Sequence, residues 1–323
     1  MELISCSIPL SIPDETIATI GFFDGVHQGH RYLLSQLKEL AGKQNLKTSI
    51  ITFRTHPRKA LHQDFQPQLL NTFEEKIDLL SSLEIDYCYI FDFDQTLSEF
   101  SAEEFMSDIL RKQLNIKSLL IGYDHKFGKN RTEGYEQYVE YGKKCGINVF
   151  KAKELKKHDK QVSSTQIRNL LLQGKIKEAG KLCTYPYLIQ GKVIEGNKIG
   201  RTIGFPTANI ETNNEKILPR EGVYAVYAFV NEKKINGMAY IGKRPTITNS
   251  GEKRIEVNLF DFNQDIYNRD IKVEFIDFIR EDVHFQSIDE LQKQLTKDKE
   301  MASLICCCKS NTQSSKKPDS TND

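Results

Sequence analysis

Residues 17–30, IATIGFFDGVHQGH, decide the fold of the N-terminal half of the chain. The first six residues predict a buried strand, because they form a short and mostly apolar run. Leucines follow at positions 33, 37 and 40, and such intervals place side chains on one face of a helix. Glycines at positions 21, 25 and 29 let the backbone turn tightly between the two elements. The stretch therefore predicts a strand, a turn and a helix.

The same strand-to-helix pattern repeats along the first half of the chain. Further strands are predicted at residues 49–53, 87–91 and 118–121, and helices at 73–83, 105–114 and 135–145. Strands that alternate with helices indicate a parallel sheet covered on both faces, which binds ligands beyond the carboxyl ends of its strands. We expect an α/β domain with a Rossmann-like parallel sheet.

Beyond residue 185 the pattern changes to strands separated by Gly, Asn and Pro. Strands are predicted at residues 187–194, 222–231, 234–241, 254–259 and 271–279, followed by one helix at about 288–304. Short strands at such spacing favour a small antiparallel β-barrel with a C-terminal helix. We expect one domain at residues 1–183, a second at 184–305, and a disordered polar tail at 306–323 that begins with three cysteines.

Composition excludes several classes of protein. The 323 residues include 45 Lys and Arg against 44 Asp and Glu, so no overall positive field would drive binding to nucleic acid or anionic lipid. The first residues do not resemble a signal peptide, and no run approaches the roughly 18 apolar residues of a transmembrane helix. The seven cysteines lack C-x-x-C spacing, which favours reduced thiols over zinc ligands. We expect a cytoplasmic protein, a monomer or weak homo-oligomer, that binds neither nucleic acid nor membranes.

The glycine-rich turn after the first strand predicts an anion site, because a helix N-terminus offers free N–H groups and a positive dipole end to phosphate. His27 and His30 are three residues apart, so both imidazoles lie on the same side of the first helical turn. There they could donate hydrogen bonds to a polyphosphate and stabilise the charge that develops during nucleotidyl transfer. The structural alternative is that one histidine caps the helix and the other lies on the surface.

The segment GFFDGVHQGH, with its H-x-G-H motif after a first strand, resembles the nucleotidyltransferase superfamily. More specifically, it resembles the adenylyltransferase half of bacterial bifunctional riboflavin kinase/FAD synthetases. The resemblance implies catalytic roles for His27 and His30 and nucleotide binding by Gly21, Phe23, Asp24, Gly25 and Gly29.

Two further segments fit this family. Residues 122–131, GYDHKFGKNR, follow a predicted strand, and the resemblance implies nucleotide binding by Asp124, Phe127, Gly128 and Asn130. The family usually has an aromatic residue where His125 stands, and a simple charged turn is the alternative for this loop.

Residues 163–168, SSTQIR, open a predicted helix, and the spacing of Ser163 and Gln166 would suit a purely structural capping box. Arg168 falls on the second turn, where its guanidinium could grip phosphate oxygens. The resemblance implies that Ser163, Ser164, Thr165 and Arg168 close over the nucleotide phosphates.

The second half contains residues 196–210, GNKIGRTIGFPTANI, in which a glycine-containing loop precedes a Phe-Pro step. Thr207 and Asn209 alternate on an extended segment and so project from one face, and hard oxygen ligands suit Mg²⁺. The segment GFPTAN resembles the riboflavin kinase signature. The resemblance implies that Thr207 binds Mg²⁺ and that nucleotide or flavin is bound by Gly200, Arg201, Gly204, Pro206 and Asn209. A β-bulge that satisfies its own polar groups is the alternative.

Glu256 lies in RIEVNLFDF, residues 254–262, and matches the catalytic glutamate of the family. A positioned carboxylate could take the proton of an attacking hydroxyl, whereas an ordinary strand glutamate would face solvent. Segments 222–224 and 241–246 also fit the family, although Tyr240, Ile247 and Asn268 depart from its common pattern.

The resemblance implies two ATP-dependent steps assisted by Mg²⁺, in which riboflavin becomes FMN and FMN becomes FAD. An enzyme with one active half, and a nucleotide-sensing or RNA-binding regulator, are the alternatives.

Overall fold

The computed structural model describes residues 1–6, 12, 14–61, 64, 66–157, 160–196, 199–243 and 253–314. The chain forms two compact units, Met1–Ser164 and Thr165–Asp323. Within the described residues, none of the helices is long and apolar enough to cross a membrane.

The first unit is built on a six-stranded sheet in the order β1-β4-β3-β2-β5-β6, and every neighbouring pair is parallel. The predicted parallel sheet is confirmed. The sequence does not predict the edge strands β1 and β6, because each has four residues and none is buried. The strands are β1 (Glu2–Ser5), β2 (Thr16–Ile20), β3 (Lys47–Phe53), β4 (Tyr87–Phe91), β5 (Ile116–Ile121) and β6 (Asn148–Lys151).

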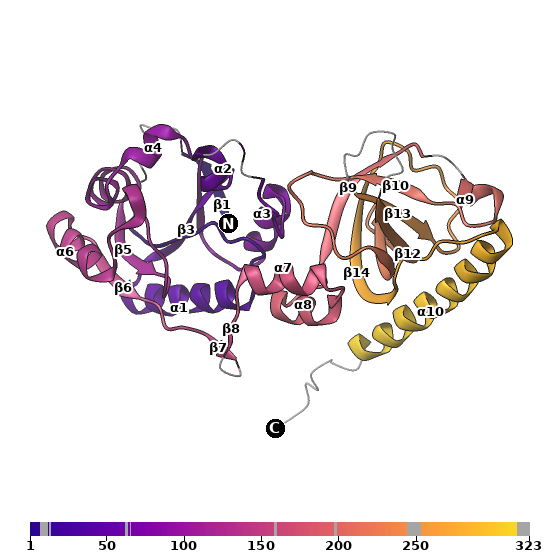
Figure 1. The fold of residues 1–323 in the computed structure, drawn as a ribbon. Coiled ribbons are helices and arrows are strands. Elements are labelled where there is room, and N and C mark those ends of the chain that lie inside the picture. The colour runs from indigo at the N-terminus through magenta and orange to yellow at the C-terminus, as the bar shows by residue number, and fades with distance from the viewer. Residues whose placement is uncertain are drawn as a thin grey trace, which may run out of the picture. The chain divides into compact units, whose positions relative to one another are not determined.

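Helices cover both faces of this sheet (Figure 1). Ile17 and Ile50 pack in one buried cluster with leucines of α1, whereas their neighbours Ala18 and Ile51 pack in another with η1. Strands buried on both faces have no polar alternation, which is why they appear as apolar runs in the sequence. The helices are α1 (Gln28–Gln44), α2 (Pro57–Leu61), α3 (Phe73–Ser81), α4 (Gln95–Glu99), α5 (Ala102–Glu104), the π-helix η1 (Phe105–Gln113), the 3₁₀-helix η2 (Lys129–Arg131) and α6 (Tyr135–Cys145).

The second unit contains a closed barrel in the order β10-β13-β12-β11-β14-β9, with every described pair antiparallel. The predicted barrel and C-terminal helix are confirmed. The strands are β9 (Leu188–Ile194), β10 (Ala208–Glu211), β11 (Gly222–Val230), β12 (Lys233–Lys243), β13 (Lys253–Leu259) and β14 (Asp270–Arg280). The helices of this unit are α7 (Ser164–Leu172), which begins at its boundary, α8 (Ile176–Cys183), α9 (Ile199–Thr202) and α10 (Ile288–Ser314), whereas the hairpin β7 (Lys156–Lys157) and β8 (Lys160–Gln161) belongs to the first unit.

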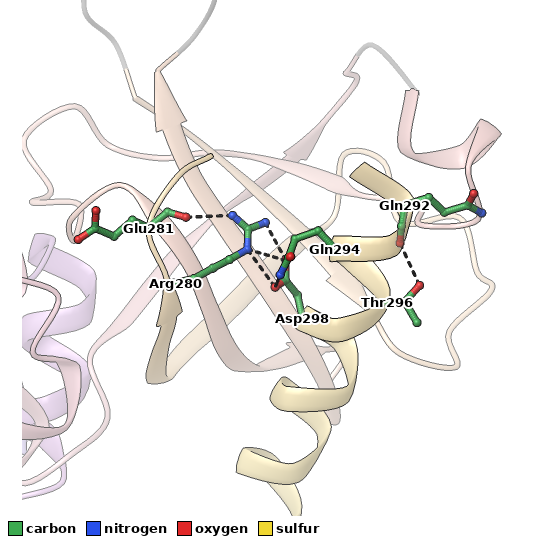
Figure 2. A network of polar contacts seen from close by, with 6 residues as sticks. All are labelled: Arg280, Glu281, Gln292, Gln294, Thr296 and Asp298. Carbon is green, nitrogen blue, oxygen red and sulfur yellow. Dashed lines mark hydrogen bonds and ion pairs between the residues drawn. The ribbon is translucent and has the colours of Figure 1, made fainter. Parts of the chain in front are cut away.

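Helix α10 lies along the outside of the barrel and is held there by a buried ion pair (Figures 1 and 2). The Nε and Nη2 atoms of Arg280 at the end of β14 donate to the Asp298 carboxylate at 2.8–3.0 Å, and Asp298 is 1% exposed. Gln294 Nε2 donates to the same carboxylate at 2.9 Å. This network ties the middle of the helix to the barrel wall.

The tail was expected to begin at Cys306, but α10 continues through this residue to Ser314. Cys306 is fully buried, and its carbonyl accepts a hydrogen bond of 2.8 Å from Tyr227 Oη of β11. The expectation of disorder from residue 306 is therefore wrong for residues 306–314, because a tertiary contact stabilises a segment whose composition alone predicts no core. Residues 315–323 lie outside the described part of the chain.

Candidate functional site

The first candidate site lies at the carboxyl end of β2, in the phosphate turn, the name used below for residues 21–29. His27 is the N-cap of α1, and its Nδ1 accepts hydrogen bonds from the backbone N–H groups of Gly29 and His30 at 3.2 and 3.4 Å. An Nδ1 that accepts leaves the ring proton of a neutral imidazole on Nε2, which can donate to a ligand. His27 therefore caps the helix through Nδ1.

His30 stacks on His27, with ring centroids 3.8 Å apart and planes inclined by 16°. Burial lowers the pKa of His30 well below its usual value, and the nearby His27 and Lys76 lower it further. The imidazole is thus neutral at physiological pH. Its Nδ1 is buried, and the described residues offer it no hydrogen-bond partner. The structure brings the two predicted histidines together at the helix N-terminus.

The other predicted residues of the phosphate turn maintain its shape. Asp24 is 6% exposed, and its Oδ1 accepts from the N–H groups of Leu70 and Asn71 at 2.8 and 3.3 Å. Phe23 is buried in the core although its φ is 56°, a conformation uncommon for residues other than glycine. Gly25 has φ 86°, and a Cβ there would lie 2.6 Å from Leu70 Cδ1. A Cβ on Gly21 or Gly29 would be 3.1 Å from the ring of Phe23 or His27.

Sequence reasoning missed Lys76 of α3, which is 2% exposed. Its ammonium donates to the carbonyls of Phe22 and Phe53 at 3.2 and 2.8 Å and to Thr52 Oγ1 at 3.3 Å. A signal was present, because position 76 shares the apolar face of its helix with Phe73, three residues before it. A lysine on an apolar helix face becomes buried on folding, so its ammonium needs hydrogen-bond acceptors in the interior.

The loop after β5 carries the second group of predicted residues. Phe127 stacks on Tyr138 at 4.3 Å, and its N–H donates to Tyr138 Oη at 3.0 Å. Gly128 has φ 86°, and a Cβ there would meet the backbone of Ala102 at 2.6 Å. His125 has a pKa lowered to about 4, chiefly by burial and then by Arg131. Asp124 is exposed, and the side chain of Asn130 lies outside the described part of the structure.

The predicted segment 163–168 spans the end of the first unit and the start of α7. Ser164 Oγ donates to the carbonyl of Asp24 at 2.8 Å and so ties this segment to the phosphate turn, and Ser163 immediately precedes it. Thr165 and Arg168 belong to the second unit. Their approach to the two histidines stays a prediction.

The second candidate site lies on the barrel, where β10 pairs with β13. Asn209 is directly opposite Glu256 in the antiparallel register, and Tyr240 of β12 is opposite Glu256 on its other side. Thr207 Oγ1 donates to Glu256 Oε2 at 3.1 Å. Glu256, which is distant from Thr207 and Asn209 in the sequence, thus lies beside both of them in the structure.

The surroundings of Glu256 include an arginine that sequence reasoning missed. Arg254 Nε lies 3.2 Å from Glu256 Oε1, and the Glu256 side chain is 22% exposed. The Arg254 guanidinium also lies over the ring of Tyr240, 5.8 Å from its centroid. Burial raises the pKa of Tyr240 to about 12, helped by the hydrogen bond from its hydroxyl to Asp282. The carboxylate thus has a hydroxyl donor and a cation at its two oxygens.

The loop that leads to Thr207 is shaped by close backbone contacts. A Cβ on Gly200 would lie 2.2 Å from the carbonyl of Phe205, and Gly204 has φ 82°. Gln292 of α10 donates to the carbonyl of Ile203 at 3.3 Å. Asn258 Nδ2 donates to the carbonyl of Pro206 at 2.7 Å. Arg201 is exposed on α9, and residues 197, 198 and 244–252 lie outside the described residues.

Comparison with known proteins matches each half of the chain to a family. Residues 10–166 match the family model described as FAD synthetase, and residues 183–306 match the one described as riboflavin kinase. The chain is similar to the solved structure entitled "Crystal Structure of Macrolide-efflux Protein from Streptococcus pneumoniae", with a TM-score of 0.83 and 32% identity over 93% of this chain and 98% of that one.

Curated relatives match along most of their length. The bifunctional riboflavin kinase/FMN adenylyltransferase of Bacillus subtilis is 37% identical over 292 residues, which cover 89% of this chain and 92% of the relative. Its counterpart from Haemophilus influenzae is 39% identical over 88% of this chain and 92% of the relative. The Escherichia coli protein of the same name is 36% identical over 87% and 90%. The chain therefore belongs to the bifunctional riboflavin kinase/FMN adenylyltransferase family.

Proposed function

We propose that this protein makes flavin coenzymes in two ATP-dependent steps, phosphorylation of riboflavin to FMN on the barrel and adenylylation of FMN to FAD in the Rossmann-like unit. The observation that carries the proposal is the meeting of Thr207, Asn209 and Glu256 within the segment that matches riboflavin kinase. The paired histidines support the second activity, because they lie at a helix N-terminus within the segment that matches FAD synthetase.

In the kinase step, the terminal hydroxyl of the ribityl chain attacks the γ-phosphorus of ATP, and ADP leaves. Glu256 accepts the hydroxyl proton, because its carboxylate is held between Thr207 and Arg254 and is still partly exposed. Asn209, beside Glu256 in the next strand, orients nucleotide or flavin. Gly200, Arg201, Gly204 and Pro206 form the loop that approaches the phosphates.

In the adenylyltransferase step, a phosphate oxygen of FMN attacks the α-phosphorus of ATP, and pyrophosphate leaves. This nucleophile is already ionised, so the chain need not supply a base. The positive dipole end of α1 and the Nε2–H of His27 stabilise the negative charge that builds on the phosphates, together with His30. We assign Arg168, with Ser163, Ser164 and Thr165, to the leaving phosphates, and the loop of Asp124, Phe127, Gly128 and Asn130 to nucleotide binding.

The donor set of the kinase site fits Mg²⁺. Thr207 offers a hydroxyl oxygen next to the Glu256 carboxylate, and Mg²⁺ is commonly held by one or two protein oxygens together with substrate phosphates. When bound, the metal would neutralise charge on the transferred phosphoryl group. In the described part of the chain, no cluster of three or more His, Cys, Asp or Glu side chains could hold a metal by itself.

We further propose that residues 1–183 and 184–305 are the two catalytic domains, and that the protein is a cytoplasmic monomer or weak homo-oligomer that binds neither nucleic acid nor membranes. The even charge balance supports the absence of nucleic-acid and membrane partners, and the seven cysteines without C-x-x-C spacing support a reducing compartment.

The test separates the two activities in one preparation. Purified protein is incubated with Mg²⁺ and ATP and with either riboflavin or FMN, and the flavins are resolved by chromatography. Glu256→Gln should abolish FMN formation and spare the conversion of FMN to FAD. His30→Ala should lower FAD formation by about a hundredfold while sparing the kinase.

Glu274→Gln is the matched control for the kinase, because Glu274 lies in another barrel strand and its side chain is 17% exposed. Conversion of riboflavin to FMN without conversion of supplied FMN to FAD would contradict the two-step proposal. Full kinase activity in Glu256→Gln would contradict the role of the carboxylate.

A further inference from the structure

Lys76 is a buried cation next to the phosphate turn that the proposed mechanism does not use. Its three hydrogen-bond acceptors are the carbonyl of Phe22, just beyond β2, and the hydroxyl of Thr52 and carbonyl of Phe53 at the end of β3. The ammonium also lies 4.2 Å from the ring centroid of Phe22. These contacts place a positive charge at the sheet edge where a parallel α/β fold binds ligands.

This charge has no carboxylate within ion-pair distance among the residues that the structure describes. Burial lowers the pKa of Lys76 to about 8, and the charges of Asp24 and Cys88 act in the opposite direction. The other charged or titratable groups around it include His30 on α1. Arg54 lies over the ring of Phe73, as Lys76 does, and His56 packs edge-on against the ring of Phe22. A buried charge that lacks an ionic partner disfavours folding, so a role in stability alone does not account for it.

The contact with Phe22 acts on the strained part of the phosphate turn. Phe23 and Val26 both have positive φ, at 56° and 35°, and neither is glycine. Such conformations persist only where the surrounding structure holds the backbone. Asp24 braces the middle of the turn through Leu70, and Lys76 braces its beginning through the Phe22 carbonyl.

We propose that Lys76 is a positioning residue of the adenylyltransferase site. Its ammonium fixes the start of the phosphate turn, and it places a buried positive charge near His30, at the end of the turn that binds the ATP triphosphate. The inference rests on the proposed adenylyltransferase activity. Bound phosphate would supply the anionic partner that Lys76 lacks among the described residues. The charge would thus be stabilised by the nucleotide, and the nucleotide by the charge.

The test compares Lys76→Met, Lys76→Arg and the control Lys43→Met, whose lysine is exposed on α1 and forms an ion pair with Glu39 in the same helix. The readouts are kcat and KM for ATP in FAD formation between about pH 6.5 and 9.5. Riboflavin kinase activity of the same preparations reports on the integrity of the other unit. Lys76→Met should lower kcat/KM for ATP by about tenfold or more at pH 7, as expected for a lost charged hydrogen-bonding group.

The pH profile distinguishes a charge from a merely structural contact. Wild-type kcat/KM should fall as the pH rises through about 8, where the ammonium loses its proton. This fall should be absent in Lys76→Met and should move upward by more than about one pH unit in Lys76→Arg, because a guanidinium stays charged. A wild-type profile in Lys76→Arg, or wild-type kcat/KM in Lys76→Met, would overturn the inference.

A measurement on the wild-type protein decides the matter if the methionine variant does not fold. The carbon next to the ammonium is labelled with ¹³C, and the Lys76 signal, assigned with Lys76→Arg, is titrated by NMR with and without α,β-methylene-ATP. The analogue should raise the titration midpoint by at least about half a pH unit. An unchanged midpoint refutes the inference, whereas a wild-type protein that forms no FAD refutes the proposed function instead.

Discussion

Substitution of Asp298 by Asn should release α10 from the barrel. The carboxylate is 1% exposed and accepts from Arg280 Nε at 3.0 Å and from Nη2 at 2.8 Å, as well as from Gln294 (Figure 2). An asparagine keeps the shape of the side chain but removes its charge and replaces one acceptor with a donor. The Arg280 guanidinium would then stay largely buried beside an amide that repels one of its N–H groups.

The expected loss follows from the burial of the two partners. Removing one member of a buried ion pair costs about 3–5 kcal/mol. The Arg280 side chain is 18% exposed and keeps a hydrogen bond to the carbonyl of Glu281, so the lower end, about 3 kcal/mol, applies. For a unit of this size, such a loss lowers the melting temperature by about 6–12 °C.

The assay combines urea unfolding with thiol labelling read by mass spectrometry. Cys306 is fully buried against β11, so its labelling reports the detachment of α10. Kinase activity should fall as well, because Gln292 of the same helix contacts the loop before Thr207. Conversion of supplied FMN to FAD should persist.

Asp289→Asn is the control, because Asp289 is an exposed residue in the first turn of the same helix. Its substitution should lower the free energy of unfolding by only about 0.5 kcal/mol. The reasoning would be refuted if Asp298→Asn protected Cys306 from labelling as well as the wild type does and if its second unit unfolded at the same urea concentration.

Three further outcomes test other parts of the structure. Gly25→Ala should destabilise the first unit by about 1–3 kcal/mol in urea unfolding and reduce FAD formation, because φ is 86° and the new Cβ would meet Leu70. The control Gly42→Ala on α1 should have neither effect, because a Cβ there meets nothing within 4 Å. Above pH 8 the folded state loses the Lys76 proton, whereas the unfolded state keeps it. The free energy of unfolding of the wild type, relative to that of Lys76→Met, should therefore rise by about 3 kcal/mol between pH 8 and 10.5, and a difference that stays constant would contradict this pKa. Chelation of divalent cations should stop both reactions. Thr207→Val should raise the Mg²⁺ concentration that the kinase reaction needs but not the one that FAD formation needs, and assays of each product at graded Mg²⁺ would check this.

Local sequence patterns determined the two kinds of fold and the outline of each site. Apolar runs and leucine spacing are imposed by strand and helix geometry over a few residues, so they predicted the parallel sheet and the barrel. Gly25 of the phosphate turn is required by its local backbone conformation, and the pairing of His27 with His30 follows from helical spacing within one turn.

Contacts between distant residues were decided only by the tertiary structure. The registers of β10 and β13 bring Asn209 and Glu256 together, and no pattern within either segment specifies that pairing. The same holds for the partner of Asp298 and for the burial of Cys306, which composition had assigned to a tail. The sequence also did not show that Lys76 is a buried cation, because its acceptors come from the ends of two strands. The energy of a buried charge depends on its neighbours in space rather than in sequence.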